Sequence, residues 1–230
     1  STLRPLVARR AKREPLQHII GNTSFRGFLI NCDKRALIPR PETEMMVDFV
    51  IQEPSLPKEI LIADIGTGTG AIAIALAKEI PSAKILAVDI SNEALTLAKE
   101  NAVLNQVEDR ISFFEGSLLS ALPAECKPNV IVANLPYIPL REKDSLQEEV
   151  RLFDPALALF GGEDGLDLIR SLLKGTKAHL ASNGLIWLEI ASGQEKLLQK
   201  EISLYPWLSY CEAIDDFVGN TRFVKIQSKE

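Results

Sequence analysis

The sequence predicts an α/β fold whose sheet is mostly parallel and ends with one antiparallel strand. From residue 59 onward, short apolar segments alternate with segments of helical periodicity. This alternation is typical of parallel strands covered by helices on both faces. The last two apolar segments are separated only by residues 215–221, so they predict a hairpin that adds an antiparallel strand. The 230 residues, 46% of them hydrophobic, are enough for one large domain and a small appendage.

The predicted strands and helices follow one another in a regular order along the main part of the chain. Pro81 ends the first of these helices, because proline cannot continue the helical hydrogen-bond ladder. We expect strands over residues 59–65, 84–89, 111–114, 129–133, 185–190, 209–214 and 222–226. We expect helices over residues 71–80, 92–104, 166–180 and 194–204.

The N-terminal quarter of the chain has a different pattern. Residues 1–20 are basic, with apolar residues at helical spacing, and favour a short solvated helix. Contact with an acidic partner surface or with RNA is the alternative. Extended segments at 25–30 and 36–38 flank a polar turn and predict a hairpin, and the prolines at 39 and 41 predict the start of a helix. We therefore expect three parts, at residues 1–22, 23–57 and 58–230.

The bulk composition limits the possible partners. The formal net charge of −5 does not favour a nucleic-acid backbone as ligand. The three cysteines are far apart and odd in number, so we expect neither a disulfide framework nor a metal site. No apolar run is long enough to span a bilayer, and the basic N-terminus lacks a signal-peptide core. We expect a cytoplasmic monomer without membrane or stable nucleic-acid binding.

A glycine-rich loop follows the first predicted strand of the sheet and opens a helix. Its three glycines let the backbone turn tightly and approach a ligand. A nicotinamide dinucleotide site is the alternative, but there the third glycine follows the second by three residues, whereas these three glycines alternate. Asp64 would also repel the pyrophosphate of such a cofactor. The other interpretation of Asp64 is a carboxylate that braces the loop. The acid that ends the next strand suits two ribose hydroxyls. The predicted cofactor site comprises Gly66, Thr67, Gly68, Thr69, Gly70 and Asp89.

The tetrapeptide Asn134-Leu135-Pro136-Tyr137 follows another apolar strand and should face the glycine loop. The Asn134 side-chain oxygen and the Leu135 carbonyl can accept the two N–H bonds of a planar amide or amine and aim its lone pair at a methyl sulfonium. Pro136 keeps Leu135 extended, and Tyr137 can stack on the flat group. The tetrapeptide therefore predicts methyl transfer from S-adenosylmethionine to a planar nitrogen, with a plain turn as the alternative.

Several further stretches are distinctive, and Pro39-Arg40-Pro41-Glu42-Thr43-Glu44 is the most specific of them. The others lie at residues 14–21, 37–38, 64–72, 150–159 and 161–166. Through these stretches the chain resembles, over nearly all of its length, the release-factor glutamine N5-methyltransferases. The glycine loop and the tetrapeptide are shared by many other methyltransferases.

The resemblance implies a seven-stranded Rossmann-like methyltransferase sheet that binds S-adenosylmethionine through Gly66 to Gly70, Asp89 and Asn134. It also implies that residues 134–137 hold the glutamine amide in the Gly-Gly-Gln motif of a class 1 peptide-chain release factor. Arg40 is a further candidate for substrate binding. Arg40, Thr43 and Glu189 are weaker candidates than the tetrapeptide. Bracing of the helix start is the alternative for Arg40 and Thr43, and plain solvation is the alternative to an indirect role for Glu189.

Three positions or segments depart from the family pattern. Leu135 stands where the family usually has proline, but its carbonyl is retained. Ser117 and Leu118 stand where the family often has an acid and an aromatic residue beside the adenine; Leu118 is kept as a candidate cofactor contact. The family also carries an N-terminal helical bundle, of which residues 1–20 would be the last piece.

Three other functions compete with this interpretation. Asn-Leu-Pro-Tyr also occurs in ribosomal RNA adenine-N6 methyltransferases, but those proteins tend to be basic and to carry a helical domain after the catalytic one. The glycine spacing disfavours a nicotinamide-dependent oxidoreductase. A cofactor-binding module without catalysis would require damage to the loop or to Asn134, and both are intact.

Overall fold

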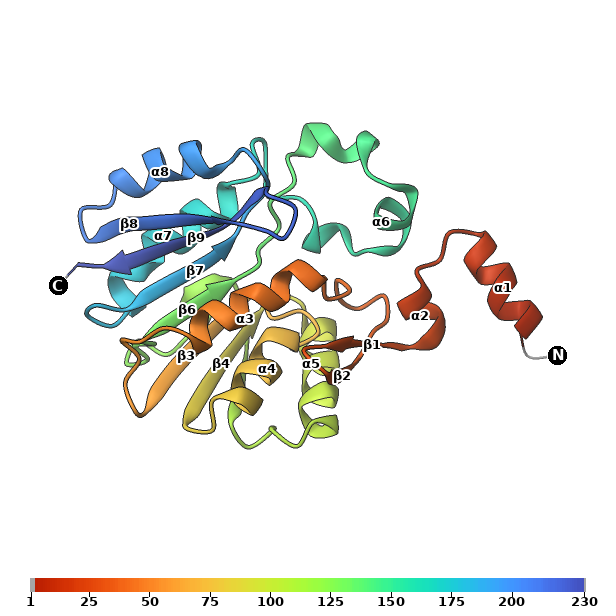
Figure 1. The fold of residues 1–230 in the computed structure, drawn as a ribbon, viewed down its shortest axis with the longest axis horizontal. Coiled ribbons are helices and arrows are strands. Elements are labelled where there is room, and N and C mark those ends of the chain that lie inside the picture. The colour runs from red at the N-terminus through yellow and green to blue at the C-terminus, as the bar shows by residue number, and fades with distance from the viewer. Residues whose placement is uncertain (1–2, 230) are drawn as a thin grey trace.

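The computed structural model describes residues 3–229, so residues 1 and 2 of the predicted N-terminal segment, and residue 230, lie outside the description. Figure 1 shows a twisted sheet between two layers of helices, with a small N-terminal extension that projects away from it. The helices are α1 (Leu3–Ala11), α2 (Leu16–Ile20), α3 (Glu44–Ile51), α4 (Ala71–Glu79), α5 (Asn92–Leu104), α6 (Glu148–Phe153), α7 (Asp167–His179) and α8 (Glu195–Ser203).

The main sheet has seven strands in the order β5-β4-β3-β6-β7-β9-β8. β9 runs antiparallel to both of its neighbours, whereas the other adjacent pairs are parallel. The predicted mostly parallel sheet with an antiparallel last strand is therefore confirmed. The strands are β3 (Ile60–Ile65), β4 (Ala83–Asp89), β5 (Ile111–Glu115), β6 (Val130–Ala133), β7 (Leu185–Glu189), β8 (Leu208–Asp215) and β9 (Thr221–Ser228).

Two apolar layers hold the sheet between its helices. Alternate strand residues face opposite sides, so Ile62 packs with α3 and α4, whereas Ala63 and Ile65 pack with α7 and α8. α4 is buried almost all round because it fits between the sheet and α3. All eleven strands and helices predicted beyond residue 58 are present, with bounds that differ by no more than two residues.

The predicted N-terminal hairpin is wrong in its register. Its strands are β1 (Asn22–Phe25) and β2 (Phe28–Asn31), joined by Arg26 and Gly27 with φ of 51° and 80°. Two positive φ values match the tight turn that suits a two-residue hairpin. Arg26 also pairs with Glu79 of α4, which holds the turn against the main domain. Residues 36–38, which were expected to form the second strand, lie instead along a pocket.

Two segments outside the main sheet, the N-terminal extension and the connection after β6, compare differently with the expectation. The basic N-terminal segment forms two short helices, and α1 buries none of its residues, in agreement with a solvated helix. Helix α6 was not predicted, because its six residues are too short to establish a helical period. It belongs to the long connection after β6, which also contains two 3₁₀ helices at Leu140–Ser145 and Ala156–Ala158.

The carboxyl ends of six strands, all except β9, lie at one edge of the sheet, where β3 and β6 are neighbours. From β3 the chain proceeds outward through β4 and β5, and it then returns to the other side of β3 with β6 (Figure 1). Such a reversal leaves a crevice between the loops that follow the two central strands, and ligands of open α/β sheets bind there. The glycine loop follows β3, and Asn134 follows β6.

Candidate active site

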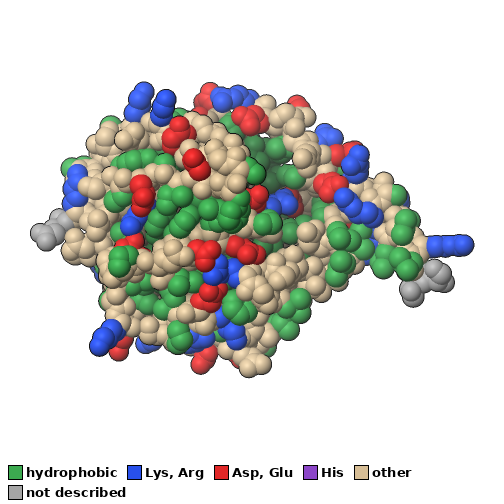
Figure 2. All heavy atoms as spheres, viewed as in Figure 1, with side chains coloured by type: hydrophobic (Ala, Val, Ile, Leu, Met, Phe, Trp, Pro, Cys, Tyr) green, Lys and Arg blue, Asp and Glu red, His purple; other side chains and the backbone are tan. Residues whose placement is uncertain are grey.

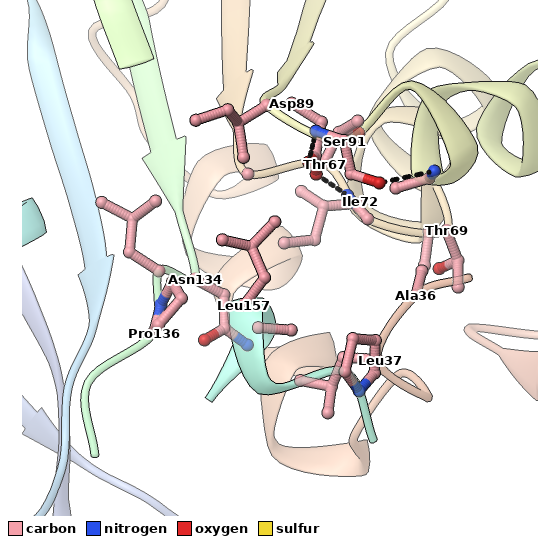
Figure 3. Close-up of a pocket in the computed structure, with 18 of the residues that line it drawn as sticks. Ala36, Leu37, Thr67, Thr69, Ile72, Asp89, Ser91, Asn134, Pro136 and Leu157 are labelled. Carbon is pink, nitrogen blue, oxygen red and sulfur yellow. Dashed lines mark hydrogen bonds between the residues drawn. The ribbon is translucent and has the colours of Figure 1, made fainter. Parts of the chain in front are cut away.

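A pocket opens where the strand order reverses, with about 1180 Å³ of empty space including its mouth. This space is large enough for a nucleoside-sized cofactor. Figure 3 shows Thr67 and Asp89 on one side of it, Asn134 and Pro136 on another, and Leu157 between them. Its walls therefore come from segments that are far apart in sequence.

Most of the predicted cofactor residues line this pocket. Those that do so are Gly66, Thr67, Gly68, Thr69, Asp89, Leu118 and Asn134. Gly70 does not line the pocket: it precedes α4 with φ of 80°, and a Cβ there would come within 3.1 Å of Ala98 Cβ. Its small size lets α4 pack closely against α5.

The glycine loop is held to the next strand by its backbone. The N–H groups of Gly66 and Thr67 both donate to the Val88 carbonyl, at 2.8 and 2.9 Å. Gly66 has φ of 77°, and a Cβ there would lie 3.1 Å from Leu135 Cδ2. Glycine is therefore required both for the turn and for the close approach of the loop to the tetrapeptide.

Asp64 braces the loop from beneath, as one of the two interpretations expected. Its Oδ2 accepts hydrogen bonds from Thr67 Oγ1 at 2.6 Å and from the Ala73 N–H at 3.2 Å. The side chain is completely buried, and this burial raises its pKa to about 7, against the effect of the two donors. Asp64 is not among the residues that line the pocket.

Asp89 is the acid that ends β4, and both of its oxygens face backbone donors. Oδ2 accepts from the Gly68 N–H and Oδ1 from the Ser91 N–H, each at 2.9 Å. Each carboxylate oxygen has two acceptor sites, so one on each oxygen is left for a ligand hydroxyl. Burial raises the pKa of Asp89, while the backbone N–H groups lower it. The residues present therefore fit a ribose diol.

The loop after β5 forms another wall of the pocket. Gly116, Ser117 and Leu118 line it, and Leu118 has a positive φ of 51°. A positive φ is costly for a leucine and persists only where the surrounding structure holds it, and such residues cluster at ligand sites. Both residues that depart from the family pattern, Ser117 and Leu118, therefore line the pocket, and their contact with an adenine stays a prediction.

Asn134 belongs to a chain of hydrogen-bonded side chains, in which Thr43 and Glu189 are buried and Asn134 and Tyr137 are half-buried. Its Nδ2 donates to Thr43 Oγ1 at 3.1 Å, and Thr43 Oγ1 donates to Glu189 Oε2 at 2.7 Å. The Tyr137 hydroxyl donates to the other oxygen, Glu189 Oε1, at 3.2 Å. The structure therefore joins two of the weaker candidates, Thr43 and Glu189, to the tetrapeptide.

The backbone of the tetrapeptide is clamped by residues whose role the sequence did not indicate. A Cβ on Gly161 would lie 2.3 Å from the Pro136 carbonyl oxygen, and one on Gly165 would lie 2.1 Å from that of Tyr137. Gln194 Nε2 donates to the same Tyr137 carbonyl at 3.1 Å. The glycines stood in a distinctive stretch of the sequence, whereas Gln194 gave no signal.

Replacing Gly161 with alanine should displace the tetrapeptide. We expect a loss of about 1–3 kcal/mol in the free energy of unfolding, as for other overpacked sites, together with a fall in methyl-transfer rate. Gly175→Ala in α7 is the matched control, because a Cβ at that position meets the Leu119 side chain at 3.4 Å, which is ordinary van der Waals contact. Thermal unfolding and initial rates check both variants; an unchanged Gly161→Ala enzyme would show that the clamp is not needed.

Arg40, the candidate substrate residue, pairs with an acid of the covering connection. Its Nη2 lies 2.9 Å from Asp154 Oδ2, and the Asp154 side chain is only 2% exposed. Burial raises the pKa of Asp154, and the guanidinium of Arg40 opposes this shift. Arg40 thus ties the segment before α3 to the connection after α6, while it also lines the pocket.

A second cavity adjoins the first and shares part of its wall. Leu37, Arg40, Asn134, Leu135, Pro136 and Ala158 line both cavities. Tyr137 lines only the second. The tetrapeptide therefore lies between one cavity lined by the glycine loop and another lined by the connection after β6.

The comparison with protein families agrees with this geometry. Residues 43–157 match the family model of the methyltransferase small domain. The match, the sheet order and the pocket at its reversal point define an S-adenosylmethionine-dependent methyltransferase.

The names of its curated relatives define the family more narrowly than the family model does. The chain is 41% identical over 219 residues to a release factor glutamine methyltransferase of Deinococcus radiodurans, which covers 95% of this chain and 76% of that one. It is 36% identical over 231 residues to the enzyme of the same name from Thermodesulfovibrio yellowstonii, covering 100% and 82% of the two chains. The chain belongs to the release factor glutamine methyltransferase family.

Solved structures confirm the fold. A ribosomal protein L11 methylase from Lactobacillus delbrueckii superposes with a TM-score of 0.62 at 23% identity, covering 85% of this chain and 82% of that one. A methyltransferase from Pyrococcus furiosus superposes with a TM-score of 0.63 at 19% identity, covering 99% and 97%. Within residues 3–229, no helix has the length and apolar character to cross a membrane.

Proposed function

We propose that this enzyme transfers a methyl group from S-adenosylmethionine to the side-chain N5 of the glutamine in the Gly-Gly-Gln motif of a class 1 peptide-chain release factor. The observation that carries the proposal is the position of Asn134 and Leu135 in the wall shared by the two cavities. A cofactor in the first cavity and an amide in the second would meet there. The names of the curated relatives support glutamine as the acceptor.

The residues around the first cavity would hold the cofactor. The cofactor supplies, when bound, a methyl group on a positively charged sulfur. Asp89 would accept the two ribose hydroxyls, and the Gly66–Thr69 loop would cover the remainder of the nucleoside. Leu118 would contact the adenine, whose flat apolar face suits its side chain. The mainly apolar walls would exclude water from the sulfur.

The tetrapeptide would bind and orient the acceptor amide. Within residues 3–229, neither Asn134 Oδ1 nor the Leu135 carbonyl accepts a hydrogen bond, so both remain available for the two N–H bonds of an amide. Holding these two bonds turns the nitrogen lone pair toward the methyl group, which is catalysis by orientation. Tyr137 would pack on the planar amide, and Arg40 would contact the acceptor loop.

Adenine-N6 of ribosomal RNA is the second candidate acceptor, because Leu135 gives the tetrapeptide the form found in those enzymes. Its chemistry at nitrogen would be the same. Against it, the net charge is −5, and Figure 2 shows acidic and basic side chains interspersed on the face it draws. A polyanion would gain little from such a surface.

A labelled-methyl assay tests the proposed function. The enzyme is incubated with labelled S-adenosylmethionine, a bacterial class 1 release factor and ribosomal RNA in one mixture. We expect the label on the release factor, and none on a release factor whose Gly-Gly-Gln glutamine is replaced by alanine. Label on RNA alone would refute the glutamine assignment while leaving the methyltransferase assignment intact.

Four further expectations, on domain organisation, oligomeric state, location and nucleic-acid binding, accompany this proposal. Residues 58–230 would form the catalytic domain, residues 23–57 would complete its pocket, and residues 1–22 would belong to the family's N-terminal helical part. The enzyme would act as a monomer in the cytoplasm, without stable binding to nucleic acid.

A further inference from the structure

Three side chains from distant segments, two of them buried and one half-buried, meet behind the acceptor site. Glu189 ends β7, Thr43 ends the 3₁₀ helix Pro41–Thr43, and Asn134 follows β6. Thr43 and Glu189 are only 4% and 2% exposed. Thr43 is 91 residues from Asn134 and 146 residues from Glu189, so only the folded sheet edge brings them together.

The hydrogens in this chain have only one consistent arrangement when Glu189 is ionised. A carboxylate can only accept, so Thr43 must donate its single hydroxyl hydrogen to Glu189 Oε2. The side of Thr43 Oγ1 that faces Asn134 is then an acceptor, and Asn134 must present its NH₂ group to it. This leaves Asn134 Oδ1 directed away from Thr43.

The same carboxylate also holds Tyr137. The Tyr137 hydroxyl donates to Oε1, while Thr43 donates to Oε2, so one oxygen orients Tyr137 directly and the other orients Asn134 through Thr43. Burying an ionised carboxylate is costly unless it is hydrogen-bonded, and here the two hydroxyls provide this compensation. Arg222 of β9 adds an attractive charge nearby.

We infer that Glu189 and Thr43 are positioning residues that select the amide orientation of Asn134 and thereby turn its oxygen, not its nitrogen, toward the acceptor. With the reverse orientation, Asn134 would present N–H groups to the N–H groups of the substrate amide and would repel it. The inference rests on the proposed function insofar as the acceptor is a nitrogen that carries N–H groups.

The first test replaces the hydroxyl of Thr43 and then restores it. Thr43→Val has the same shape but no hydroxyl, so Asn134 loses its orienting partner. We expect kcat to fall about 10- to 100-fold, the range for a misplaced catalytic group, with the cofactor Kd from calorimetry unchanged. Thr43→Ser restores the hydroxyl and should recover most of the rate. A merely structural role would instead lower the unfolding temperature and leave kcat of the folded fraction intact.

The second test uses Glu189→Gln and the pH dependence of kcat. Burial raises the pKa of Glu189, Glu42 adds to this shift, and the donors Thr43 and Tyr137 and the charge of Arg222 oppose it. In the wild-type enzyme, protonation at low pH converts one carboxylate oxygen into a donor, so kcat should fall on the acid side. Glutamine can accept from only one of the two hydroxyls, so kcat should be about 10-fold lower and should lack this acid limb.

The outcomes separate this inference from the proposed function. The acceptor is identified by whether the wild-type enzyme transfers the labelled methyl group to a release factor or to RNA. The positioning role is tested by the ratio of variant kcat to wild-type kcat on that same acceptor. A Thr43→Val enzyme with wild-type kcat would overturn the inference. A Glu189→Gln enzyme that keeps the wild-type rate and acid limb would do the same.

Discussion

Asn134→Ala is expected to slow methyl transfer about 30- to 1000-fold while S-adenosylmethionine still binds. The loss corresponds to about 2–4 kcal/mol of transition-state stabilisation, by analogy with removal of one preorganised hydrogen-bond partner from an active site. The Asn134 oxygen would hold one of the two acceptor N–H bonds, and the Leu135 carbonyl alone cannot fix the direction of the lone pair. Single-turnover rates at saturating cofactor measure this effect.

A matched control is available in the same chain. Asn183 is exposed in a turn with φ of 58°, so Asn183→Gly removes an asparagine side chain without loss of backbone fit. This variant should keep the wild-type rate. Calorimetry provides the second check, because Asn134 also lines the cofactor cavity. A cofactor affinity that falls in parallel with the rate would contradict an orienting role for Asn134.

Asp89→Ala should have the opposite profile, with a loss of cofactor affinity of roughly 100-fold. Hydrogen bonds to a charged acceptor contribute about 1.5–3 kcal/mol each, and the two ribose bonds together would exceed one such contribution. The variant also releases the Gly68 and Ser91 N–H groups, so the glycine loop should loosen. At saturating cofactor, kcat should change far less than Kd does.

Isothermal titration with S-adenosylmethionine measures this prediction. Asp109→Ala is the control, since Asp109 is an exposed acid that lies outside the walls of the pocket. Removing that acid changes the net charge by the same amount and should leave Kd unaltered. Unchanged cofactor binding by Asp89→Ala would refute the ribose assignment.

The sheet could be predicted because its strands and helices carry local patterns. Apolar runs in β3 and β6 and helical periods in α5 and α7 are properties of short windows, and they survive in the fold almost residue for residue. The hairpin at β1 and β2 could not be placed in the same way. Residues 36–38 are apolar because they pack along the pocket, and a short apolar run has the same appearance in a strand.

Part of the candidate site could also be predicted from local sequence patterns, and part could not. Glycine spacing and the acid that ends the next strand are local signals, so the cofactor, and most of the residues that line the pocket, could be predicted from the sequence by itself. The tetrapeptide likewise indicated a planar nitrogen as the acceptor. Each of these signals depends on residues that a single loop brings together.

The tertiary structure alone decided how Asn134 is oriented. Glu189, Thr43 and Tyr137 come from separate segments, and nothing in the sequence around any one of them indicates the others. The contacts of Gly161 and Gln194 with the backbone of the tetrapeptide likewise join segments that are distant in sequence. The physical reason is that one asparagine amide can present either its oxygen or its nitrogen, and only the neighbours supplied by the folded sheet edge determine which one faces the substrate.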